Sequence, residues 1–166
     1  MRSTGRCPAA SFGAAGAPVN LIVGRQMKHA ATPSALPRRV WVLVILYFIA
    51  SLAHFAHNAE YIAFYPNMPH WLTRENVYVA WLGVTGIGAS GLFLFRLGLQ
   101  TLGALLVSVY GALGLDGLTH YTLALCSEHT LAANVTIWSE AIVGFLLLLA
   151  SVLLLRERIA RIIGSC

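Results

Sequence analysis

Residues 40–59 read VWVLVILYFIASLAHFAHNA, an apolar run without Lys, Arg, Asp or Glu. Twenty helical residues rise about 30 Å, which matches the hydrocarbon thickness of a bilayer. Arg38 and Arg39 directly precede the run, and His54 and His57 lie near its far end. The segment therefore predicts a membrane-spanning helix that is apolar at one end and polar at the other.

Three further apolar runs follow along the chain, and they cover residues 77–95, 97–115 and 134–155. Charged residues make up only 10% of the 166 residues, against about 25% in soluble domains, and the mean hydropathy is +0.73. The connections are too short for a separate soluble domain. We therefore expect an all-α integral membrane four-helix bundle over residues 40–166.

Residues 1–39 differ in composition from the rest of the chain. They are rich in Ala, Gly, Ser, Pro and Arg and contain no acidic residue, which predicts a disordered basic tail. Three interpretations stay open: a transit peptide, a basic cytosolic tail, or a translation start that in fact lies at Met27.

Basic residues predict the orientation in the membrane. Ten of the 11 Lys and Arg residues flank the spans on one side, and only Arg74 lies on the other. Because cytoplasmic loops carry the excess of Lys and Arg, both termini are expected in the cytoplasm of a multi-pass protein, in a bacterial-type inner membrane or an organelle membrane. The same flanking distribution argues against a nucleic-acid partner. The expected partners are the bilayer and either further copies of the chain or a larger membrane complex.

Ionisable side chains gather at one end of the predicted spans. His54, His57 and Glu60 close the first span, Asp116 and His120 close the third, and Glu140 lies inside the fourth. Charges at membrane depth are costly, so each such group needs a partner or a function. Residues three or four apart share a helix face. The pattern therefore predicts a polar site in the outer half of the bundle.

Three functions suit such a site. The leading hypothesis is a metal site for zinc, iron, copper or manganese, or a haem held between His120 and a histidine of the first span. The candidate metal ligands are His54, His57, Glu60, Asp116, His120 and Glu140. The second hypothesis is a membrane-embedded enzyme that uses Glu140 and His54 as acid and base on a lipophilic substrate. The third is an accessory subunit in which these groups only fix helix packing.

Small residues and cysteines complete the sequence analysis. Glycines crowd the second and third spans, where they are expected to allow close helix packing; they are Gly83, Gly86, Gly88 and Gly91, and Gly111, Gly114 and Gly117. The cysteines Cys7, Cys126 and Cys166 show no metal-ligand spacing and fall on opposite sides of the predicted membrane, so lone thiols are expected.

Overall fold

The computed structural model describes residues 36–64, 69 and 71–164. Within these residues the chain is helical and contains no strand. Four long helices carry the fold, and they are α2 (Arg38–Glu60), α3 (Arg74–Arg96), α4 (Gln100–Leu113) and α6 (Leu131–Gly164). Shorter elements connect them, namely η2 (Ile62–Phe64), η3 (Asp116–Thr119), α5 (His120–Leu123) and η4 (Cys126–Glu128).

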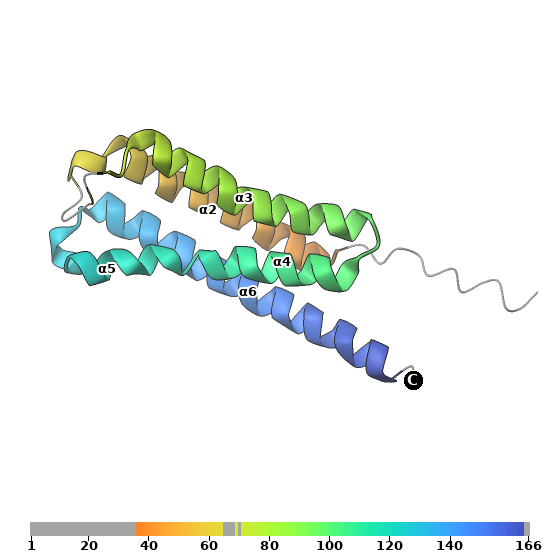
Figure 1. The fold of residues 1–166 in the computed structure, drawn as a ribbon. Coiled ribbons are helices and arrows are strands. Elements are labelled where there is room, and N and C mark those ends of the chain that lie inside the picture. Colours follow the sequence, from red (N-terminus) through yellow and green to blue (C-terminus); the bar gives the residue numbers. More distant parts are fainter. Residues whose placement is uncertain (1–35, 65–68, 70, 165–166) are drawn as a thin grey trace, which may run out of the picture. The chain divides into compact units, whose positions relative to one another are not determined.

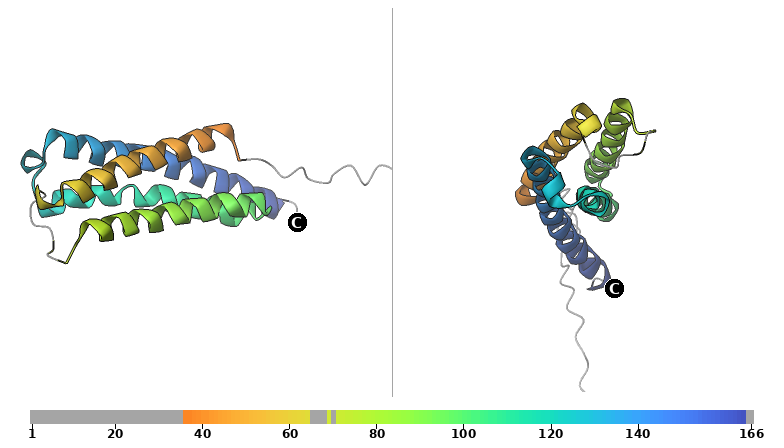
Figure 2. Two further views of the ribbon diagram at one scale, coloured as in Figure 1. Left: turned by 90° about the horizontal axis from the view of Figure 1, so that it is seen from above. Right: turned by 90° about the vertical axis from the view of Figure 1, so that its left-hand side faces the viewer.

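The long helices form a ring in which each packs against two others (Figures 1 and 2). Both α2 and α4 contact α3 on one side and α6 on the other. The core between them is apolar toward the end where α2 begins, where Val40, Val44 and Leu147 are buried. The predicted all-α four-helix architecture is thereby confirmed, and four helical segments are long and apolar enough to cross a membrane: α2, α3, α6, and the stretch Gln100–Leu123 in which η3 and α5 continue α4. The predicted tail lies outside the described residues, except that α2 already begins at Arg38.

Helix ends differ from the predicted spans, because capping rather than hydropathy decides them. α3 begins at Arg74, where the Thr73 hydroxyl accepts a hydrogen bond from the Asn76 amide at 3.3 Å. α4 begins only at Gln100, since the chain turns at Gly98 with a φ of 80°. α6 spans 34 residues, Leu131–Gly164, because its terminal arginines end the apolar run but are good helix formers.

Glycines hold α4 against α6. A Cβ atom at Gly111 would lie 2.6 Å from the Leu148 backbone nitrogen, and one at Gly114 would lie 3.0 Å from the Gly144 Cα. The expected packing role is therefore confirmed for these positions. It is wrong for Gly83 and Gly86 within a single chain, because a Cβ there would meet nothing within 4 Å.

Candidate functional site

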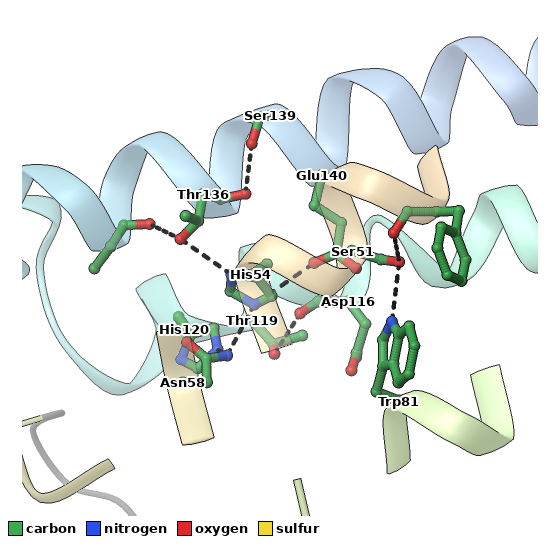
Figure 3. A network of polar contacts seen from close by, with 12 residues as sticks. Ser51, His54, Asn58, Trp81, Asp116, Thr119, His120, Thr136, Ser139 and Glu140 are labelled. Carbon is green, nitrogen blue, oxygen red and sulfur yellow. Dashed lines mark hydrogen bonds and ion pairs between the residues drawn. The ribbon is translucent and has the colours of Figure 1, made fainter. Parts of the chain in front are cut away.

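The centre of the site is a contact between α2 and α6. His54 is 2% exposed and Glu140 is 1% exposed, and His54 Nε2 lies 3.6 Å from Glu140 Oε2 (Figure 3). The sequence analysis placed both residues in the outer half of the bundle and named them as a candidate acid and base. The structure brings them together.

Asn58 joins this pair to a second imidazole. Its amide nitrogen lies 2.9 Å from His54 Nε2 and 3.2 Å from His120 Nε2 (Figure 3). A primary amide carries two N–H groups, so it can donate one hydrogen bond to each imidazole. Sequence reasoning missed Asn58, although the residue follows His54 by one helical turn and therefore had to share its face.

Thr136 completes the hydrogen bonding of His54. The Thr136 hydroxyl donates to the Ala133 carbonyl at 2.9 Å and lies 3.5 Å from His54 Nδ1. Because its proton is already used, the hydroxyl oxygen accepts from Nδ1–H. With Asn58 donating to Nε2, these contacts match a neutral His54 imidazole whose proton is on Nδ1.

This tautomer sets the chemistry of Glu140. The single lone pair of His54 Nε2 already accepts from Asn58, and Glu140 Oε2 lies 3.6 Å from the same nitrogen. A carboxylate on Oε2 would lie buried beside this electron-rich nitrogen without a charged partner among the described residues, whereas a neutral carboxyl group avoids that cost. The geometry thus favours a neutral Glu140 carboxyl group beside a neutral His54 imidazole.

A cavity of about 270 Å³ adjoins the pair, and residues of α2, α3, η3, α5 and α6 line it. Its polar lining consists of His54, Asn58, Asp116, Thr119, His120 and Glu140. The remaining wall is largely apolar and includes Phe55, Val77 and Leu123. The site therefore combines a few convergent polar groups with an apolar wall, as small-molecule sites commonly do.

Two buried oxygen atoms of the site have no hydrogen-bond partner among the described residues. They are Glu140 Oε1 and Asn58 Oδ1. Leaving a buried acceptor unsatisfied costs about 1–3 kcal/mol, so a bound molecule or ordered water is needed beside them.

Gly117 keeps the flank of the pair open. A Cβ atom there would lie 3.3 Å from Glu140 Oε2 and 3.6 Å from His54 Nε2. The residue lies in η3, where the chain leaves the α-helical geometry of α4. Its position beside the pair follows from that tighter turn, and the spacing of the glycines alone did not reveal it.

The six predicted ligands do not share one centre. His54, Asp116, His120 and Glu140 line the cavity described above, whereas His57 lines a separate cavity of about 460 Å³ together with Tyr61 and Phe64. Glu60 lies outside both, since its Oε1 atom is 2.6 Å from Arg74 Nη2 and accepts a hydrogen bond from the Tyr78 hydroxyl at 2.8 Å.

The metal hypothesis finds no support in this geometry. Within the part of the chain that the structure describes, no group of three or more His, Cys, Asp and Glu side chains is placed to hold a metal ion. For a haem, His54 and His120 would have to present Nε2 atoms to an iron between them, but the Asn58 amide lies against both.

Comparison with known proteins identifies no relative: the chain matches no protein-family model, no curated protein and no solved structure. The class of protein is therefore defined by the fold and the site, as an all-α bundle of four membrane-length helices with a polar cavity at one end.

Proposed function

We propose that the chain is an integral membrane protein with four spans and cytoplasmic termini. Its outer surface supports insertion, because large apolar side chains are exposed along every long helix; examples are Ile49, Leu82, Leu105 and Phe145. Such a continuous apolar exterior suits lipid and would promote aggregation in water. The arginines of the described residues support the orientation, since all but Arg74 fall at the start of α2, at the end of α3 or in the C-terminal part of α6.

We further propose that the protein binds a small lipophilic molecule in the cavity and exchanges a proton with it through Glu140 and His54. The observation that carries this proposal is Glu140 Oε1, a buried oxygen without a partner on the wall of a cavity. In a purely structural polar cluster we would expect a protein group to satisfy that oxygen. An unsatisfied group at a mixed polar and apolar cavity is better explained by a ligand.

The roles of the residues follow from their contacts. Glu140 is the group that gives or takes the proton, and the polar His54 imidazole lies 3.6 Å from it. Asn58 and Thr136 hold the His54 ring in place. The apolar wall admits a lipophilic molecule and limits water near the pair.

Labelling with a carbodiimide tests this proposal. Dicyclohexylcarbodiimide is lipophilic and reacts with protonated carboxyl groups, so it should modify Glu140 in the protein reconstituted into lipid vesicles. Peptide mapping by mass spectrometry would locate the adduct. The expected result is labelling at Glu140 that a water-soluble carbodiimide does not reproduce.

Two variants serve as controls. Glu140→Gln should abolish the adduct, whereas Glu60→Gln should leave it unchanged, because Glu60 is bonded to Arg74 away from the cavity. If Glu140 stays unmodified while the reagent labels another carboxyl group, the proposal fails and a structural role for the cluster replaces it. Metal analysis and an absorption spectrum of the same sample would reveal any metal ion or haem.

A further inference from the structure

We infer that the molecule bound in this cavity is a lipophilic amine. The inference rests on the proposed function and names its substrate class. The unsatisfied atoms of the site, Glu140 Oε1 and Asn58 Oδ1, are both hydrogen-bond acceptors. A complementary ligand must therefore bring donors, and a protonated amine brings two or three on a single atom.

The charges around the cavity favour a cation. Asp116 lines it as a second carboxyl group, and no Lys or Arg is among its lining residues. Arg74, the basic residue at this end of the described helices, is bonded to Glu60 instead. An anionic ligand would meet two acidic groups, Asp116 and Glu140, and no Lys or Arg among the lining residues. The imidazoles of the lining, His54 and His120, both already contact the Asn58 amide, so the cavity selects against an anion.

The rest of the lining favours an apolar body on the same ligand. Phe55, Ile62, Leu72, Val77 and Leu123 contribute side chains to the wall. The volume of about 270 Å³ is at the lower end of ligand pockets, which typically measure about 300–1,000 Å³. A single ring or short chain that carries one amino group matches both the size and the division between polar and apolar walls.

The proton step is balanced without any further reactant. A neutral amine that arrives from the bilayer takes the Glu140 carboxyl proton: the O–H bond breaks, an N–H bond forms with the nitrogen lone pair, and an ammonium–carboxylate pair remains. In neutral water an alkylamine is already protonated, with an ordinary pKa near 10. Binding of that ammonium ion to protonated Glu140 therefore releases one proton to the solvent.

Isothermal titration of the purified full chain in detergent tests the inference with three probes that share a phenyl ring and are similar in size: benzylamine, benzyl alcohol and benzoate. Titration at pH 7 in phosphate and in Tris, whose ionisation enthalpies differ, gives the number of protons released. We expect benzylamine to bind at least tenfold more tightly than the other two, because its charge-assisted hydrogen bonds are lost in the alcohol. About one proton should be released for each benzylamine bound.

Variants and a competition assay separate the possible outcomes. Glu140→Gln should weaken benzylamine binding at least tenfold and abolish proton release, whereas Glu60→Gln should change neither. Benzylamine should also protect Glu140 from dicyclohexylcarbodiimide. If the alcohol or benzoate binds as well as the amine, or if none of the three binds, the amine inference is overturned even where carbodiimide labelling of Glu140 persists. Loss of that labelling in the unliganded protein overturns the proposed function itself.

Discussion

At the scale of single residues, the site depends on a buried carboxyl group that is only half satisfied. Glu140 Oε2 faces His54 at 3.6 Å, while Glu140 Oε1 has no partner among the described residues. Asn58 and Thr136 fix the imidazole from its two ring nitrogens. The arrangement holds His54 rigidly and leaves Glu140 available to a ligand.

The tautomer of His54 gives a direct prediction. Because Asn58 donates to Nε2 and the Thr136 hydroxyl accepts from Nδ1–H, the ring should be neutral with its proton on Nδ1. Nitrogen-15 NMR of imidazole-labelled protein in lipid vesicles at pH 7 distinguishes the two tautomers, and His54→Gln assigns the signal. A proton found on Nε2 would contradict the proposed hydrogen-bond directions.

The proposed role of Glu140 implies that this residue lowers the stability of the fold. Glu140→Leu removes the unsatisfied oxygen, and His54 Nε2 keeps its bond from Asn58. We expect the free energy of unfolding, measured by denaturant titration in detergent, to rise by about 1–3 kcal/mol. Glu140→Gln is the matched control, because it keeps a polar group at the same place and should gain little. A marked loss of stability in Glu140→Leu would show that the carboxyl group is structurally required.

At the scale of elements, glycines set how closely α4 and α6 approach and where α4 ends. Gly111 and Gly114 lie against the backbone of α6, and η3 (Asp116–Thr119) then continues the chain in a tighter turn. That turn places Gly117 beside Glu140 and His54 while Asp116 lines the cavity. The position of the cavity wall formed by η3 therefore depends on how closely α4 packs against α6.

A pair of alanine substitutions tests this contact. In Gly111→Ala the new Cβ would lie 2.6 Å from the Leu148 backbone nitrogen, so the helices must separate, and unfolding in detergent should become easier by about 1–3 kcal/mol. Gly83→Ala meets nothing within 4 Å and should be neutral or stabilising by up to about 1 kcal/mol. Equal effects of the two substitutions would contradict the described packing of α4 on α6.

At the scale of the whole molecule, the two ends of the bundle differ. One end holds the polar cavity, whereas the core toward the other end is closed by Val40, Val44 and Leu147. α6 is about 51 Å long, which exceeds the hydrocarbon thickness of about 30 Å. Its C-terminal end extends past the neighbouring helices in Figure 1. Because that end carries arginines, we expect it to lie in the cytoplasm.

Reporter fusions test this orientation. A reporter after Gly98 or at the C terminus should read cytoplasmic, and one after Ser127 should read external, because arginines cluster on the first side. Arg96→Glu is the control, because it removes a single positive charge from that side. It should leave the topology intact, since five other arginines of the described residues remain there. An external C terminus would place the cavity at the cytoplasmic face instead.

The sequence by itself determined the four helices and the depth of the polar residues. Each apolar run is long enough to cross a bilayer, and the number of residues from a helix end to an ionisable group fixes its height. His54 and Glu140 could be placed at similar height in the bundle on this basis. The helix ends were less accurate, because Gly98, the Thr73 cap and the arginines of α6 act independently of hydropathy.

Only the tertiary structure decided which groups of equal depth meet. Helix geometry turns Glu60 about 120° away from His54 but Asn58 only about 40°, so Asn58 joins the site and Glu60 pairs with Arg74 outside it. Which face of each helix points inward depends on the neighbours it packs against, and those contacts come from residues distant in the chain. For the same reason the unsatisfied oxygen of Glu140 and the cavity beside it appear only once α2, α3, η3, α5 and α6 are assembled.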